Sequence, residues 1–160
     1  MEQDSDLYEK DFHAWTQHTA ALLRSGRFDE VDIAHAADEI DDMGKRDLKE
    51  LNSRMQILLM HLLKWQYQPS KRSPSWLSTI VSQRIEIDAL LRQSPSLRPK
   101  LLAELADNYV GAVKRAVPET GFGKDRFPPR CPFTVEQVLD EQFLPEAKVR
   151  PKARRTRERS

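Results

Sequence analysis

The chain has a single cysteine, Cys131, and no long run of apolar residues. One thiol excludes an intrachain disulfide and a paired-cysteine zinc site, and it favours a reducing compartment. The longest apolar run is far shorter than the roughly 20 residues that cross a bilayer. The N-terminus is acidic, whereas a secretory or mitochondrial signal is basic. We therefore expect a cytoplasmic protein without a membrane span.

Two further features are missing from the sequence. No stretch alternates apolar and polar residues as a half-buried strand does, and no catalytic, cofactor or metal motif of useful specificity is present. A chain of this length buries roughly 70% of its unfolded surface as one domain. We therefore expect an all-α protein with its own core, and we favour a function without catalysis, cofactor or metal.

The strongest positive signal is the segment from Ile57 to Trp65, which is apolar almost all round. A helix of this kind cannot face water, so other helices must surround it. Apolar residues recur at three- and four-residue steps from 48 to 65, which is the pattern of an antiparallel bundle. We expect this segment to form the centre of the core.

The first half of the chain is predicted to contain three helices, each with an apolar stripe at helical spacing. The first runs over residues 7–25 and ends at Gly26, in a position typical of a left-handed cap. A short acidic helix follows, with Asp29 and Asp32 as a weak capping box at its start and Gly44 at its end. The central helix is expected over about 45–67.

The second half of the chain is predicted to contain two further main helices. One starts at Pro74 with Ser73 as its N-cap and ends near residue 93. The next runs over about 101–116 and is closed by Pro118. Gly111 costs this last helix about 1 kcal/mol in propensity, which a close helix crossing would offset.

The C-terminal part divides into a short helix and a basic tail. Thr134 and Gln137 form a capping box for a helix over about 135–139. Residues 146–160 lack apolar periodicity and are rich in basic side chains, so we expect them to be disordered. The predicted organisation is a single all-helical bundle of about five main helices over residues 1–145, followed by this tail.

Charge is distributed unevenly, although the formal net charge is only +1. Residues 1–44 contain 3 basic and 12 acidic residues, net −9. Residues 45–145 contain 16 and 11, net +5, and residues 146–160 contain 7 and 2, net +5. Such a separation indicates either that charged partners bind or that the acidic and basic segments dock on each other.

Several blocks occur in the same order as in a known bacterial family: Leu7–Trp15, Ala37–Gly44, Leu59–Gln66, Ser94–Leu97 and Cys131–Thr134. On these blocks the chain resembles the domain of unknown function 29 family over about residues 7–145. The resemblance implies an all-helical bundle encoded by bacteria. It implies no established activity, and it supplies no site residues to transfer to this chain.

The acidic second helix carries a candidate metal site. Carboxylate and imidazole groups recur on one of its faces, and such groups bind iron, manganese or zinc in helical bundles. This face lies opposite the apolar stripe of Ile33, Ala36, Ala37 and Ile40, and the second Glu-x-x-His of di-iron bundles is missing. We favour a solvated face without metal, formed by Asp32, His35, Glu39 and Asp42.

His61, inside the apolar segment, is a candidate acid–base group. An imidazole among apolar residues must find a hydrogen-bond partner or lose its charge. If Glu39 or Asp38 of the preceding helix reached it, the pair would have shifted pKa values suited to proton transfer. We favour a core histidine with a satisfied hydrogen bond, and we interpret Cys131 as a small apolar plug.

Cations alternate with aromatic residues across the expected turn between the third and fourth helices. Such an array stacks nucleic-acid bases and neutralises phosphates. Trp65 and Trp76 fall on apolar stripes, so we favour the interpretation that they anchor the turn and that the cations lie at its rim. The array consists of Lys64, Trp65, Tyr67, Lys71, Arg72, Trp76 and Arg84.

Three functions follow from these features. The first is a non-catalytic interaction or regulatory module that binds another protein or itself. The second is a nucleic-acid-binding accessory protein, and the third is a metal-dependent or acid–base enzyme built around His61 and the acidic helix. In the second function the tail binds phosphates weakly and without sequence specificity, through Lys148, Arg150, Lys152, Arg154, Arg155, Arg157 and Arg159.

Overall fold

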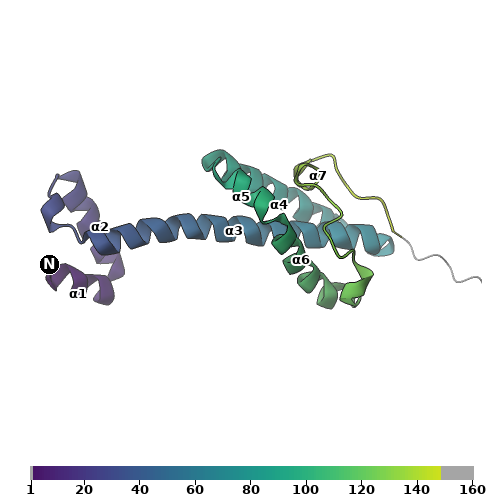
Figure 1. Cartoon of the computed structure of the whole chain (residues 1–160), viewed down its shortest axis with the longest axis horizontal. Helices are drawn as coiled ribbons and strands as arrows, with labels where there is room; N and C mark the ends of the chain where they lie inside the picture. Colours follow the sequence, from purple (N-terminus) through teal and green to yellow (C-terminus); the bar gives the residue numbers. More distant parts are fainter. Residues whose placement is uncertain (1, 149–160) are drawn as a thin grey trace, which may run out of the picture. The chain divides into compact units, whose positions relative to one another are not determined.

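A computed structural model describes residues 2–148, and within that range the chain is helical and contains no strand (Figure 1). The predicted all-α class is confirmed. The chain forms two compact units, one ending at Leu48 and the other beginning at Lys49. Short 3-10 helices lie in three of the connections, at Phe28–Glu30 (η1), Pro69–Lys71 (η2) and Lys124–Arg126 (η3).

The first predicted helix is divided into two, α1 (Glu2–Lys10) and α2 (Phe12–Arg24). The break occurs at Asp11, which leaves the helical conformation and accepts a 2.9 Å hydrogen bond from the backbone N–H of Ala14. An N-cap of this kind starts a new helix even where the apolar stripe continues. Gly26 follows α2 with a φ of 72°, as predicted for a left-handed cap.

Helix α3 (Ile33–Tyr67) unites the acidic helix and the central helix that were expected to be separate. Gly44 was predicted to end the acidic helix, and this was wrong because Gly44 lies inside α3. A glycine costs a helix only about 1 kcal/mol, and the ion pair between Asp41 and Lys45, 2.6 Å, spans it at i and i+4. The acidic segment and the apolar segment are therefore parts of one helix.

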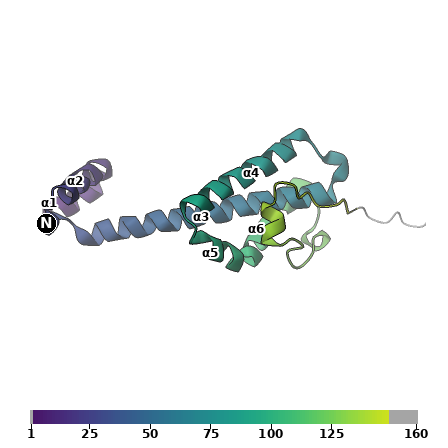
Figure 2. The ribbon, with the colours of Figure 1, turned by 90° about the horizontal axis from the view of Figure 1, so that it is seen from above.

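In the second unit, α4 (Pro74–Gln93) lies antiparallel beside the C-terminal part of α3 (Figures 1 and 2). Arg54 near the middle of α3 contacts Gln83, and Lys64 near its end contacts Trp76. The apolar segment is the centre of the core, as predicted. Its fully buried side chains, together with those one and two turns earlier, are Leu51, Met55, Leu58, Leu59, Leu62 and Leu63.

The fifth predicted helix is also two helices, α5 (Leu97–Ala103) and α6 (Leu105–Thr120). Pro118 was expected to close this helix but lies in its last turn. Beyond it, the Thr120 hydroxyl donates a 2.7 Å bond to the carbonyl of Ala116, one turn back. The end is set instead by Gly121, whose φ of 71° forms a left-handed cap.

Local capping signals specify two helix starts correctly. The Ser73 hydroxyl accepts from the N–H of Trp76, and α4 begins there with proline at its first position. Thr134 and Gln137 form the predicted capping box at the start of α7 (Val135–Leu139), with hydrogen bonds of 3.2 and 3.0 Å. These groups are close in sequence, so their geometry does not depend on the rest of the fold.

A close crossing of α6 over α3 occurs at Gly111, as its helix-propensity cost suggested. A Cβ built at Gly111 would lie 2.5 Å from the side-chain carbonyl carbon of Gln56. The Gln56 amide in turn donates to Asn108 and accepts from Arg115. The missing side chain thus leaves room for a polar cluster between α3 and α6.

Candidate functional site

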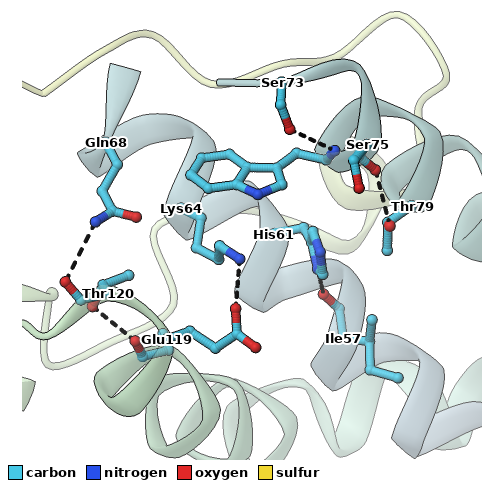
Figure 3. Close-up of polar contacts among 11 residues, drawn as sticks. Ile57, His61, Lys64, Gln68, Ser73, Ser75, Thr79, Glu119 and Thr120 are labelled. Atoms are coloured by element: carbon cyan, nitrogen blue, oxygen red, sulfur yellow. Dashed lines mark hydrogen bonds and ion pairs between the residues drawn. The ribbon is translucent and has the colours of Figure 1, made fainter. Parts of the chain in front are cut away.

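The candidate site of the second unit is centred on Lys64, which is only 6% exposed (Figure 3). Its ammonium nitrogen lies 2.6 Å from the Glu119 carboxylate on α6 and 4.5 Å from the centroid of the Trp76 ring on α4. The hydrogen bond from Lys64 lowers the pKa of Glu119. Lys64 therefore connects three helices through an ion pair and a cation–π contact.

His61 lies one turn before Lys64 and has a satisfied hydrogen bond (Figure 3). Its Nδ1 lies 2.8 Å from the carbonyl oxygen of Ile57 and donates to it. Burial lowers the pKa of His61, and the nearby Lys64 charge acts in the same direction. The neutral imidazole is thus the favoured form in the folded protein.

The structure does not bring Glu39 or Asp38 to His61. Glu39 accepts a 2.6 Å hydrogen bond from the Tyr8 hydroxyl, whereas His61 is bonded to Ile57. All three candidate residues belong to the single helix α3, where the sequence had predicted two separate helices. His61 and Lys64 lie one turn apart on α3, and Lys64 in turn contacts Trp76 on α4 and Glu119 on α6.

The cations of the aromatic array are mostly used inside the fold. The Arg72 guanidinium stacks 4.7 Å from the centroid of the Trp65 ring and donates to the Trp65 carbonyl. Arg84 is 5% exposed and donates two 2.8 Å bonds, to the carbonyls of Val138 and Phe143. The prediction that these cations lie at a rim was wrong for Lys64 and Arg84, which are both buried. Arg84 satisfies two backbone carbonyls, and Lys64 reaches the partly exposed carboxylate of Glu119. Lys71 is exposed.

The acidic part of α3 has the opposite orientation to the predicted one. Asp32 accepts from the His35 ring at 2.5 Å, and that ring stacks on Tyr8 with centroids 4.0 Å apart. Glu39 binds the Tyr8 hydroxyl, and this hydrogen bond raises the pKa of Tyr8 to about 12. The polar face expected in solvent therefore packs on α1. It does so because tyrosine offers both a ring for the imidazole and a donor for the carboxylate.

Two apolar stripes are exposed as a result. The α3 stripe consists of Ile33, Ile40 and Met43, which are 62%, 69% and 59% exposed. The α4 stripe consists of Leu77, Val81 and Ile85, which are also exposed. Sequence reasoning assigned Ile33 and Ile40 to the interior. Their i and i+7 spacing identifies a shared face but does not say what covers it.

Within residues 2–148, the remaining candidate residues do not come together in one cluster. No set of three or more His, Cys, Asp or Glu side chains in that range is placed to hold a metal ion. The half-buried Cys131 thiol lies 3.3 Å from the Phe133 carbonyl oxygen, and burial raises its pKa. In the same range, no helix is both long enough and apolar enough to span a membrane.

Only the start of the basic tail is described by the structure. The backbone N–H of Lys148 donates a 2.8 Å hydrogen bond to the carbonyl of Gln66 in α3. The tail thus begins in contact with the helix that forms the core of the second unit. The other cations predicted to bind polyanions lie outside the described residues, namely Arg150, Lys152, Arg154, Arg155, Arg157 and Arg159.

The two histidines of α3 are expected to titrate on opposite sides of the ordinary histidine pKa, about 6.5. The hydrogen bond to Asp32 raises the pKa of His35, and burial lowers that of His61. His61 therefore stabilises the fold above about pH 6.5 and loses this contribution as the pH falls to its folded pKa. The contribution of His35 is present below about pH 6.5 and is lost as the pH rises through its folded pKa.

An NMR titration of the ring protons measures both midpoints. Asp32→Asn is the matched control, because it should lower the midpoint of His35 and leave that of His61 in place. Midpoints in the reverse order, or an Asp32→Asn effect on His61 alone, would contradict the assignment.

The fold is that of an all-helical protein whose candidate polar residues are held by internal contacts. The family model described as domain of unknown function DUF29 matches residues 7–144. The chain therefore belongs to this family, and the resemblance noted in its sequence is confirmed. No curated protein and no solved structure matches the chain.

Proposed function

We propose that the protein is a non-catalytic interaction module whose α3 stripe binds a basic amphipathic helix of another protein. The observation that carries this proposal is the exposure of Ile33, Ile40 and Met43, each by more than half of its surface. Single exposed apolar residues are ordinary, but several large apolar side chains exposed on one helix face are typical of a binding site.

The spacing of the α3 stripe suits a helical partner. Positions i, i+7 and i+10 lie on one side of a helix and extend over roughly 15 Å of its axis. An amphipathic helix presents anchors at the same spacing, so two such faces can pack along each other for about three turns. The partner is therefore expected to supply a complementary apolar stripe.

Charge around the stripe favours a basic partner over a second copy of this chain. Residues 1–44 carry a net charge of −9, and Asp38, Asp41 and Asp42 are exposed on the same helix as the stripe. Lys45 neutralises part of this charge by pairing with Asp41 and Asp42. Two copies would still bring strongly negative surfaces together, which opposes self-association at this site.

The chain's own tail has the right charge but too few apolar side chains. Between residues 149 and 160 it offers one valine, one proline and one alanine among its charged residues. These cannot cover three large apolar side chains at helical spacing. A separate helix with an apolar face and a lysine or arginine rim satisfies both requirements.

The two alternative functions have less support. Of the array thought to bind nucleic acid, Lys64, Arg72 and Arg84 already make internal contacts. His61 has Ile57 as its partner, where the enzyme hypothesis invoked a carboxylate. The exposed α3 stripe takes part in neither alternative, whereas the interaction module uses it directly.

A designed peptide tests the proposed site. The probe is a helical peptide with leucines at i, i+3, i+7 and i+10 and lysines elsewhere, and its binding is followed by fluorescence anisotropy. We expect Ile33→Ser combined with Ile40→Ser to weaken binding at least tenfold, since two exposed anchors are lost, without changing the melting temperature.

Three controls make the peptide experiment specific. Ile85→Ser, on the α4 stripe, should leave the affinity unchanged. A peptide of the same composition with scrambled leucines should bind poorly, and a glutamate version should not bind. Equal binding of the scrambled peptide would show that the protein recognises only the charge of the peptide. That result would refute the proposed helix-binding site.

A further inference from the structure

A groove of about 790 Å³ lies between α6 and the loop that follows it. Its volume falls within the range of small-molecule sites, about 300–1,000 Å³. One wall is a face of α6 and the other is an irregular segment just after η3. The apolar side chains of the two walls are Val110, Val113 and Val117, and Phe127, Pro128 and Pro129.

The loop wall is fixed in place by specific contacts. The Tyr109 hydroxyl donates a 2.6 Å hydrogen bond to the carbonyl of Pro128, and burial raises the pKa of Tyr109, so the donor keeps its proton. Phe127 is buried and packs edge-on against Tyr67, with ring centroids 5.2 Å apart. A wall held in this way is already formed before a ligand arrives, which lowers the entropy cost of binding.

The rim of the groove carries two lysines and one aspartate. Lys114 projects from α6 and Lys124 from η3, and neither forms an ion pair with any other residue of the described range 2–148. Asp125 also lines the groove and opposes them. The balance of one positive charge beside an apolar floor matches a molecule with an apolar body and a single negative group.

We propose that this groove binds an alkyl carboxylate. The alkyl chain lies along Val110, Val113 and Val117, and the carboxylate lies between Lys114 and Lys124. The valine wall extends over roughly 10 Å of the helix axis, which suits a chain of medium length. The basic tail of the protein is an unsuitable occupant, because its cations would meet the two lysines.

An NMR titration with sodium decanoate below its micelle concentration tests the site. We expect the methyl resonances of Val110, Val113 and Val117 to shift, with a dissociation constant of about 1 mM or lower. The combined Lys114→Gln and Lys124→Gln variant should weaken binding about tenfold. Asp125→Asn should tighten binding by up to a few-fold, because it removes the opposing charge.

The controls separate the groove from general association with the alkyl chain or with charge. Lys100→Gln changes an exposed lysine on α5 and should leave the affinity as it is. Decyltrimethylammonium has the same chain with the opposite charge and should bind more weakly, and acetate should cause no shift of the valine methyls. Val110→Ser should weaken decanoate binding with both lysines intact.

Several results would overturn the proposal. These are an absence of valine shifts, shifts spread over the whole surface, equal binding of the cationic analogue, and an unchanged affinity in the double-lysine variant. Valine shifts that depend on protein concentration without ligand would show that a second copy occupies the groove instead. The groove belongs to the second unit and the α3 stripe to the first, so either proposal can fail without the other.

Discussion

Replacing Leu58 by aspartate is expected to leave the second unit unfolded. Leu58 is fully buried at the centre of the core, and loss of such a side chain alone costs about 2–5 kcal/mol. Burying an unpaired carboxylate adds several kcal/mol more, against a total stability of about 5–15 kcal/mol for a domain. Circular dichroism during urea unfolding should show no cooperative transition of this unit.

The matched control for Leu58→Asp is Ile85→Asp, since Ile85 is 58% exposed on α4. This variant introduces the same charge where water solvates it, so the unfolding transition should move little. Leu58→Ala should be intermediate, with a cooperative transition at lower urea. Native helical content and an unchanged urea midpoint in Leu58→Asp would show that the apolar segment is not the centre of the core.

The second large effect is expected from Arg84→Met. Methionine keeps much of the side-chain volume but removes the donors to the carbonyls of Val138 and Phe143. Hydrogen bonds from a charged group contribute about 1.5–3 kcal/mol each, so we expect a loss of about 3 kcal/mol or more in the free energy of unfolding. We also expect the segment from Thr134 to Pro145 to detach from α4.

Limited proteolysis and urea unfolding together test this result. The variant should be cleaved within residues 134–145 at a protease concentration that leaves the native protein intact. Arg92→Met is the control, because Arg92 is exposed on the same helix and pairs with Asp88, also exposed on α4. A stability loss no greater than that of Arg92→Met, with no new cleavage, would mean that Arg84 does not hold this segment.

The two effects have different consequences for the proposed sites. Leu58→Asp removes the framework on which α6 is built, so the groove should be lost with it. Arg84→Met acts on the segment around α7, so decanoate binding at the valines of α6 should survive. Neither change touches the α3 stripe, which lies before Leu48. Peptide binding at the α3 stripe should therefore persist in Arg84→Met.

Several features could be predicted because their causes are local. The all-α class follows from apolar residues at helical spacing, and the buried segment from 57 to 65 follows from a helix without a polar face. Ser73, Thr134 and Gly26 mark helix ends through contacts or backbone angles within a few residues. Such signals act in the same way whatever the rest of the chain does.

The candidate site was predictable only in part. His61, Lys64 and Trp76 were singled out from residue type and position, and the structure places the Lys64 ammonium over the Trp76 ring. Their partners were not predictable, because Glu119 lies 55 residues from Lys64 in the chain. The groove on α6 gave no signal, because its second wall is a loop whose position depends on the bond from Tyr109 to Pro128.

The sequence by itself determined the helical class, the core segment, the helix ends marked by Gly26, Ser73 and Thr134, and the family of this protein. Only the tertiary structure decided that α3 passes through Gly44, and which side of its acidic part faces water. A periodic pattern defines two faces of a helix, but the choice between them depends on which neighbour packs there. Tyr8 stacks on the ring of His35 and donates a hydrogen bond to the Glu39 carboxylate. It would offer Ile33 and Ile40 no such polar contact. The apolar side chains are exposed for that reason.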